Sequence, residues 1–252
     1  MNAVKGLLFD IGGVLYSGSH LIGNAPDTVA ALQAHYPVRF LTNTTRHVPE
    51  YILQKLKNFG FSLKEEELFT ALRAARDFLS AEEATALTLM TDEASAYFDA
   101  FYSETPDYVL VGDAYTNFDY AHMNRAFRAL QNNAGLIAAA KNRYFQDADG
   151  ELSMDAGGFI AALEFATGKE ARIIGKPSKT FFHLAVTSMG LKPEEVLMIG
   201  DDIEADINGA QQAGLHTALV KTGKFQESDL EKGITPDLLL EDVNTLPKYL
   251  LP

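Results

Sequence analysis

Residues 7–15 read Leu7-Leu8-Phe9-Asp10-Ile11-Gly12-Gly13-Val14-Leu15. The apolar run before the carboxylate is too short for a helix, and two glycines follow soon after it. This pattern predicts a buried parallel strand that ends at Asp10. Ligand sites in α/β folds form at the carboxyl edge of such a sheet, so Asp10 is the first candidate for a functional residue.

Short apolar strands alternate with helices along the rest of the chain. Strands are expected at 6–10, 38–41, 86–90, 108–111, 136–140, 172–174, 196–199, 216–220 and 237–240. Helices are expected at 27–35, 49–58, 118–131, 155–167, 180–189 and 206–213. The alternation predicts parallel sheets with right-handed crossovers. We therefore expect a doubly wound α/β core over 1–78 and 172–252, with an α/β domain at 79–171 inserted between the second and third core strands.

The composition excludes several classes of partner and chemistry. Of the 252 residues, 47% are hydrophobic, which is ample for a packed interior, and the net charge is −13. This charge argues against nucleic acid and against an anionic membrane, because both attract clusters of Lys and Arg. The absence of cysteine excludes disulfides and thiol nucleophiles. Without an apolar stretch of membrane-spanning length or a signal-peptide pattern, a cytoplasmic location is expected.

Two further carboxylates follow the strand expected at 196–199 and suit a metal site beside Asp10. Asp201 comes directly after Gly200, and Asp206 lies about one helical turn further on. An aspartate can attack phosphorus and form an acyl phosphate, which makes Asp10 a candidate nucleophile. Asp201 would join Asp10 in holding Mg²⁺, a cation that prefers oxygen ligands. Asp206 would orient the waters of that metal.

Three polar residues at other strand ends suit a phosphoryl group. Thr42 and Asn43 follow the strand at 38–41 and offer a hydroxyl and amides at a helix entrance, although they would also serve as helix caps. Lys176 follows the strand at 172–174 and would neutralise charge between carboxylates and phosphate, although a solvated turn is the alternative. His20 and His47 are expected to be surface or helix-start residues, with a position facing the site as the alternative.

The order of these residues resembles the haloacid dehalogenase (HAD) superfamily, whose four motifs match 10–15, 42–43, Lys176 and 200–206. The resemblance covers essentially the whole chain. It implies a HAD-like core with a larger, C2-type α/β cap inserted between the second and third motifs. It also implies a Mg²⁺-dependent phosphatase that acts on a small phosphorylated substrate. Proteins with this cap are often dimers, so a homodimer is expected by resemblance alone.

Residues 10–16, 198–203 and 221–225 look like the phospholysine phosphohistidine inorganic pyrophosphate phosphatase group. That group lacks the second aspartate of the first motif and has a small polar residue there, whereas this chain has Gly12. The resemblance implies that the backbone carbonyl of position 12 binds the metal. It also implies that the cap loop with Asp155 and Gly157 faces the active site and helps select substrate, with a helix N-cap as the alternative.

Gly12 removes a side-chain acid and base, and such a group is typically worth ~10²–10⁴ in rate. A poor alkoxide leaving group needs the acid most. The sequence therefore predicts a preference for P–N or P–O–P bonds, as in phospholysine, phosphohistidine or pyrophosphate, over sugar phosphates. Two alternatives stay open: a broad phosphomonoesterase that accepts sugar or aryl phosphates, and a phosphate-binding protein that has lost turnover through Gly12. A dehalogenase is a weaker third choice, because that branch does not use a metal.

Overall fold

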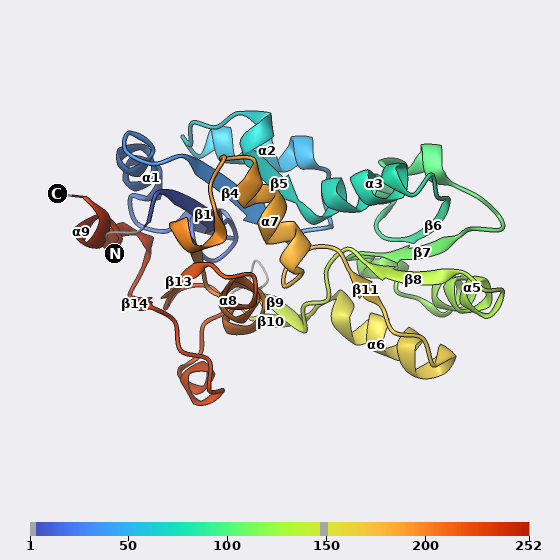
Figure 1. Cartoon of the computed structure of the whole chain (residues 1–252). Coiled ribbons are helices and arrows are strands. Elements are labelled where there is room, and N and C mark those ends of the chain that lie inside the picture. The colour runs from blue at the N-terminus through green and yellow to red at the C-terminus, as the bar shows by residue number, and fades with distance from the viewer. Residues whose placement is uncertain (1–3, 147–150, 252) are drawn as a thin grey trace.

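Strand β1 (Gly6–Asp10) lies inside a six-stranded sheet. The computed structural model describes residues 4–146 and 151–251. The strand order is β14 (Leu238–Leu240), β13 (His216–Val220), β12 (Val196–Gly200), β1, β4 (Val38–Thr42) and β5 (Leu68–Thr70), and every neighbouring pair is parallel. This larger sheet occupies the left half of Figure 1 and confirms the predicted doubly wound α/β class.

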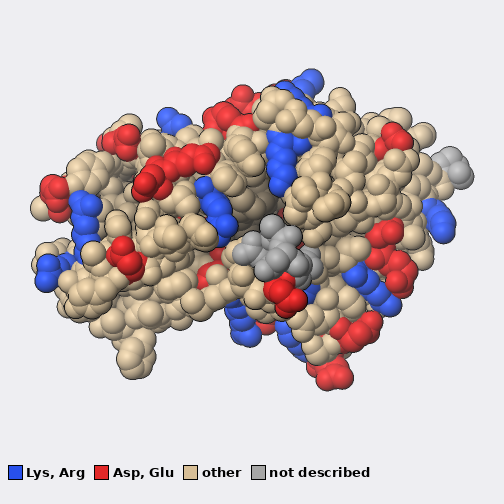
Figure 2. Space-filling view, turned by 180° about the vertical axis from the view of Figure 1, so that it is seen from behind, with Lys and Arg blue, Asp and Glu red and all other residues tan. Residues whose placement is uncertain are grey.

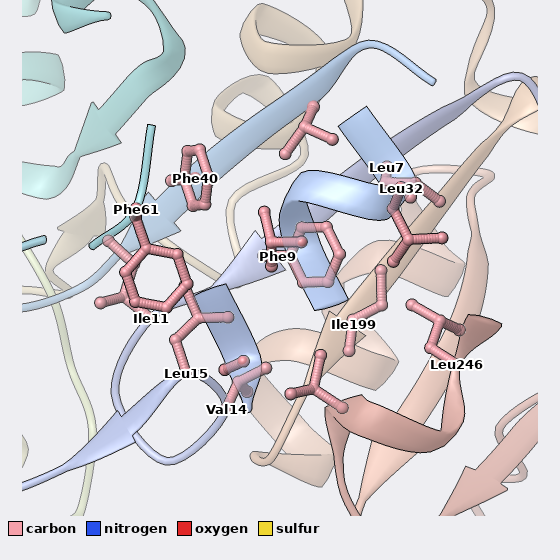
Figure 3. Close-up of a cluster of buried hydrophobic side chains, with 14 of the residues drawn as sticks. Leu7, Phe9, Ile11, Val14, Leu15, Leu32, Phe40, Phe61, Ile199 and Leu246 are labelled. Atoms are coloured by element: carbon pink, nitrogen blue, oxygen red, sulfur yellow. The ribbon is translucent and has the colours of Figure 1, made fainter. Parts of the chain in front are cut away.

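Helices cover both faces of the larger sheet because successive strand residues point to opposite sides. Leu7 and Phe9 join a buried cluster with α1 (Ala25–Gln33) and α2 (Pro49–Asn58), to which the segment before α9 (Pro247–Leu250) also contributes. Figure 3 shows this cluster around Phe9. Leu8 points the other way, into a cluster with α7 (Lys179–Thr187) and α8 (Gly209–Gln212). The strand that carries Asp10 is therefore buried on both faces.

A smaller parallel sheet occupies the right half of Figure 1. Its order is β11 (Arg172–Ile173), β8 (Gly135–Ala138), β7 (Tyr108–Val111) and β6 (Ala86–Leu89). Apolar residues of α5 (Tyr120–Gln131) and α6 (Ala156–Thr167) pack in one cluster against this sheet. Those of α3 (Ala71–Ala81) and α4 (Asp92–Ala96) pack in a separate cluster against it. Each sheet thus has its own apolar core.

Short elements complete the described chain. Two antiparallel hairpins pair β2 (Tyr16–Ser17) with β3 (His20–Leu21), and β9 (Tyr144–Gln146) with β10 (Leu152–Met154). Short 3₁₀ helices lie at Glu65–Glu67, Asp99–Phe101, Tyr115–Asn117, Pro193–Glu195, Glu227–Glu231 and Val243–Thr245, and a π-helical turn lies at Ile203–Asn208. The first hairpin directly follows the Asp10 motif, so it borders any ligand that binds at the carboxyl end of β1.

The strand order of the larger sheet reverses beside β1. From β1 the chain adds β4 and β5 on one side and later adds β12, β13 and β14 on the other. The switch point therefore lies between β1 and β12, where Phe9 pairs with Ile199. Ligands of open α/β sheets bind in the crevice at the carboxyl ends of the strands at such a point. Asp10 and Asp201, which end and follow these two strands, reach the same crevice.

Several elements differ from the sequence prediction. The pattern does not predict β5, because three residues carry little periodicity. Strand β11 pairs with β8 and so extends the smaller sheet instead of the larger one. The smaller sheet is therefore inserted between the third and fourth strands of the larger sheet, and the domain limits 78/79 and 171/172 stay a prediction. The helix expected at 206–213 begins earlier, because the Asp202 carboxylate accepts bonds from Glu204 N and Ala205 N at 3.0 and 2.9 Å.

The surface carries charged side chains of both signs. Acidic and basic side chains are interspersed on the face shown in Figure 2. Within 4–146 and 151–251, no helix has the length and apolar character needed to span a bilayer.

Candidate active site

A cavity of about 290 Å³ lies at the carboxyl edge of the larger sheet. Asp113, Asn142, Phe145 and Asp155, which lie in or beside the smaller sheet's connections, line it together with residues of the larger sheet's edge. The predicted residues that the cavity brings together are Asp10, Gly12, Thr42, Asn43, Asp155, Lys176, Asp201 and Asp206. Segments up to 196 positions apart in the sequence thus meet at one site.

Lys176 joins two carboxylates inside this cavity. Its Nζ lies 2.6 Å from Asp10 Oδ1 and 2.5 Å from Asp206 Oδ1. The lysine is 3% exposed, and all three side chains are buried. Burial lowers the pKa of Lys176, but the charges of Asp10 and Asp206 outweigh it, so the net pKa is raised. The lysine is therefore a fixed positive charge beside the carboxylate of Asp10.

Asn43 holds the backbone of Lys176 in place. Its Oδ1 accepts a hydrogen bond from Lys176 N at 2.8 Å, and its Nδ2 donates to Lys176 O at 2.8 Å. Nδ2 also donates to Asn142 Oδ1 at 3.1 Å, so both amide hydrogens are used. The Asn43 side chain thus positions the lysine, and the binding of a phosphate oxygen by Asn43 stays a prediction. Thr42 is also buried, and its hydroxyl oxygen accepts from Thr44 N at 3.1 Å.

Asp201 enters the site between two glycines. Its Oδ2 accepts a hydrogen bond from Lys224 N at 2.7 Å, whereas its buried Oδ1 has no hydrogen-bond partner in the part of the chain that the structure describes. A Cβ on Gly13 or on Gly223 would lie 2.0 Å from Asp201 Oδ2. Both glycines have positive φ, +81° and +63°. Close approach of these two backbones therefore encloses the carboxylate.

The geometry of the acidic cluster fits a divalent cation. Oxygens of Asp10, Asp201 and Asp206 all lie within 4.8 Å of one another. Lys176 contacts two of these three carboxylates, those of Asp10 and Asp206, and the charge of Lys224 also acts on Asp201. Burial and the neighbouring Asp10 charge raise the pKa of Asp201 well above its usual range, and burial raises that of Asp206 to about 7. A divalent cation would relieve this repulsion and would give the unpartnered Asp201 Oδ1 a partner.

Replacement of Gly13 by Ala is expected to lower the free energy of unfolding by about 2–5 kcal/mol. The added methyl group meets Asp201 Oδ2, and the positive φ adds its own strain. Gly18→Ala is the matched control: Gly18 also has positive φ, +58°, but its Cβ would meet nothing within 4 Å. The control should lose only about 1–2 kcal/mol. Urea unfolding measures both, and equal losses would contradict the enclosed-carboxylate interpretation.

Arg46, in the loop after β4, ties the larger sheet's edge to the smaller sheet. Its Nε donates to Asp113 Oδ2 at 2.8 Å, and its guanidinium lies 4.7 Å from the ring centre of Tyr115 and 5.2 Å from that of Phe145. Thr45 Oγ1 accepts from Asp113 N at 2.7 Å. These contacts close one side of the cavity.

The loop before α6 reaches the cavity through Asp155 but not through Gly157. Asp155 caps the helix, because its Oδ1 accepts from Ala156 N at 2.6 Å, and burial raises the pKa of Asp155. Gly157 lies off the cavity wall, where a Cβ would come within 2.4 Å of Asn142 O. Gly157 thus permits close packing of α6 against residues 141–142, and a contact with substrate stays a prediction.

Two basic residues of the cavity, Lys224 and His47, have no predicted role in the site. Lys224 comes from the stretch 221–225, which resembled a known group but predicted no role; its Nζ lies 3.4 Å from Asp202 Oδ2. His47 lines the cavity, stacks on Tyr51 at 4.2 Å and lies 3.1 Å from Glu93. His20 is exposed in β3, as expected. A basic residue just past a core strand was the available signal for Lys224.

Comparison with protein families gives two matches along the chain. A model described as haloacid dehalogenase-like hydrolase matches residues 7–102, and one described as HAD-hydrolase-like matches residues 173–246. Haloacid dehalogenase-like hydrolase domain-containing protein 2 of Homo sapiens is 40% identical over 94% of this chain and 92% of its own length. Phospholysine phosphohistidine inorganic pyrophosphate phosphatase of Xenopus laevis is 40% identical over 90% and 87%.

Solved structures share the fold along the whole chain. A 4-nitrophenylphosphatase from Thermotoga maritima superposes with a TM-score of 0.89 at 23% identity, over 98% of this chain and 97% of the other. A p-nitrophenyl phosphatase from Archaeoglobus fulgidus gives a TM-score of 0.88 at 25% identity, over 97% and 98%. These matches place the cavity described above on a fold that is shared with phosphatases.

Proposed function

Since the chain belongs to the haloacid dehalogenase-like hydrolases and is a phosphatase, we propose that it is a Mg²⁺-dependent phosphohydrolase with Asp10 as nucleophile. The observation that carries this proposal is the buried contact between Asp10 and Lys176, 2.6 Å apart within a cluster of three carboxylates. A lysine with only a structural role would not need a cluster of three carboxylates around it. Perturbed charge clusters of this kind collect at functional sites.

The proposed reaction has two displacements at phosphorus. A carboxylate oxygen of Asp10 attacks the phosphoryl group, the bond to the leaving group breaks, and its electron pair departs with that group. Water then attacks the phosphorus of the acyl phosphate, which releases inorganic phosphate and restores the Asp10 carboxylate. Lys176 supplies positive charge to the phosphoryl oxygens in both displacements. The Thr42 hydroxyl would donate to one of the same oxygens.

The residues that would hold Mg²⁺ are Asp10, Asp201 and the backbone carbonyl of Gly12, with Asp206 orienting the waters of the metal. When bound, the cation would neutralise charge on the phosphoryl oxygens as a Lewis acid. The unpartnered Oδ1 of Asp201 and the close grouping of three buried carboxylates support this assignment.

Substrates with P–N or P–O–P bonds fit the site better than sugar phosphates. Gly12 carries no acid that could protonate a poor alkoxide leaving group. Phosphate is a better leaving group than an alkoxide, and the nitrogen of a phosphoramidate can take its proton from solvent. The name of the relative from Xenopus laevis, with its phospholysine, phosphohistidine and pyrophosphate, supports the same preference.

A broad phosphomonoesterase is the second candidate, and the p-nitrophenyl phosphatase from Archaeoglobus fulgidus favours it. Both candidates share one further proposal, that the part around the smaller sheet is a cap over the core. Its predicted limits are 79–171, with the core at 1–78 and 172–252, and β11 of the smaller sheet lies just past the second limit. The contacts of Arg46 with Asp113, Tyr115 and Phe145 support it, since they hold that part against the cavity. A closed cap would exclude bulk water from the reaction.

A single substrate panel distinguishes the candidates. Phosphate release would be measured for pyrophosphate, imidodiphosphate, phospholysine, phosphohistidine, several sugar phosphates and p-nitrophenyl phosphate, with and without Mg²⁺. We expect selective turnover of the P–N and P–O–P compounds. Sugar phosphates as the best substrates would overturn that preference and favour the phosphomonoesterase. Phosphate binding without any turnover would favour a catalytically impaired binding protein.

Removal of the metal is expected to abolish phosphate release, and Mg²⁺ should restore it. Asp201→Asn should bind Mg²⁺ at least about 10-fold more weakly in calorimetry, because it replaces an anionic ligand by a neutral one. Mg²⁺ should also raise the melting temperature of the wild type, since it binds the folded site. Asp99→Asn, at an exposed position, is the control and should leave both values unchanged. Unaltered Mg²⁺ binding in Asp201→Asn would refute this metal site.

A further inference from the structure

Lys55 is a cavity residue that the proposed chemistry does not use. It lies in α2 and lines the cavity beside the first hairpin. Its Nζ lies 4.1 Å from the ring centre of Tyr16 and 5.9 Å from that of Phe59, and it donates to Gly18 O at 3.2 Å. The ammonium therefore lies over aromatic rings at the side of the cavity, with one backbone carbonyl as its hydrogen-bond partner.

Lys55 differs from the other cationic side chains of the cavity in having no acidic partner. Lys176 contacts Asp10 and Asp206, Lys224 contacts Asp202, Arg46 contacts Asp113, and His47 contacts Glu93. Across 4–146 and 151–251, no carboxylate oxygen lies within 4.0 Å of Lys55 Nζ. Burial lowers the pKa of Lys55, and among the residues that the structure describes no acidic group offsets this cost.

We propose that Lys55 binds a negative charge on the leaving group of the substrate, and that it selects diphosphate-like compounds over monoesters with a neutral leaving group. The ammonium and the Tyr16 ring would form a side pocket next to the reacting phosphoryl group. Lys176 contacts Asp10, whereas Lys55 lines the same cavity beside Tyr16 and Gly18. The reacting phosphoryl group and a second anionic group of one ligand would therefore meet different cations. This inference rests on the proposed function and narrows its substrates to pyrophosphate and imidodiphosphate.

The surroundings of Lys55 suit an anion better than they suit a purely structural lysine. A partly buried ammonium gains more from an anionic acceptor than from one neutral carbonyl, because the attraction between two opposite charges adds to the hydrogen bond. The rings of Tyr16 and Phe59 exclude water from one side of the ammonium and so strengthen its interaction with an anion. The structural alternative is that Lys55 only anchors the hairpin through Gly18 O.

Lys55→Met tests the proposal, with Lys57→Met as the matched control on the exposed side of the same helix. Calorimetry in the presence of Mg²⁺ would compare methylenediphosphonate, which carries a second anionic group, with methylphosphonate, which does not. In Lys55→Met we expect binding of methylenediphosphonate to weaken by about 10- to 100-fold, the range for a hydrogen bond to a charged partner. Methylphosphonate binding should be unchanged, Lys57→Met should match the wild type, and Lys55→Arg should keep the preference.

Turnover provides an independent measurement. In Lys55→Met, KM for imidodiphosphate should rise by the same factor, whereas KM for p-nitrophenyl phosphate should stay within about 2-fold. Equal weakening for both phosphonates would assign Lys55 to anchoring the hairpin and would overturn the proposal, as would unchanged binding of both. A wild type that binds the phosphonates with the expected preference but hydrolyses nothing would refute the proposed function while leaving this selectivity supported.

Discussion

Asp10→Asn is expected to lower phosphate release by about 10³-fold or more for every substrate. The amide has nearly the shape of the carboxylate but lacks the anionic oxygen that attacks phosphorus. Its oxygen can still accept a hydrogen bond from Lys176, which lies 2.6 Å from Asp10 Oδ1 in the wild type. Because the substitution also removes one charge from a crowded acidic cluster, the variant should fold and remain as stable as the wild type or more so.

The measurement is single-turnover and steady-state phosphate release, together with urea unfolding. Asp27→Asn in α1, on an aspartate whose partner is Asn24 outside the cavity, serves as the control and should retain full activity. A variant that unfolds would leave loss of activity unexplained, so unchanged stability is part of the expected result. Residual turnover within 10-fold of the wild type would identify another nucleophile and refute the proposed role of Asp10.

Gly12→Asp is expected to raise turnover of sugar phosphates by about 10²–10⁴-fold. A Cβ at Gly12 would meet nothing within 4 Å, so the backbone accepts a side chain there without a clash. Gly12 lines the cavity, and a carboxyl group at this position can protonate an alkoxide leaving group and later accept a proton from the attacking water. Turnover of pyrophosphate should change less, because its leaving group needs little protonation.

Gly12→Asn is the control for this gain, since it adds the same volume without an acid or base. We expect it to leave sugar phosphate turnover near the wild-type value. An equal gain in both variants would mean that side-chain bulk, rather than proton transfer, limits the wild type. The absence of a gain in Gly12→Asp would show that another group already supplies the proton, and Tyr16, Asp113 and Asp155 on the cavity wall would be tested next.

Local pattern was sufficient to predict much of the fold. The helix at 49–58 and the strands at 6–10, 108–111 and 216–220 have the predicted limits, because each combines a clear apolar period with Pro, Gly or polar residues at its ends. The pattern missed helix α3 and strand β5, and it assigned β11 to the wrong sheet. The two or three residues of β5 and β11 carry no period, and their sheet membership depends on pairing with residues far away in the sequence.

The sequence predicted those parts of the candidate site that depend only on the parallel direction of the strands. Parallel strands end at the same edge, so polar residues at the ends of β1, β4 and β12 had to lie near one another. The role of Asn43 did not follow from this rule. Its amide is occupied by the backbone of Lys176, 133 positions later, and no local pattern encodes that contact.

The sequence by itself determined the α/β class, the family and the set of residues at the strand ends, because apolar period and motif order are local properties. Only the tertiary structure decided which charges are paired. It gives Lys176 two carboxylates, places the ammonium of Lys55 over the Tyr16 ring, encloses Asp201 between Gly13 and Gly223, and keeps the space beside Gly12 open. The physical reason is that charge pairing and free volume depend on distances between side chains that only the packed chain fixes.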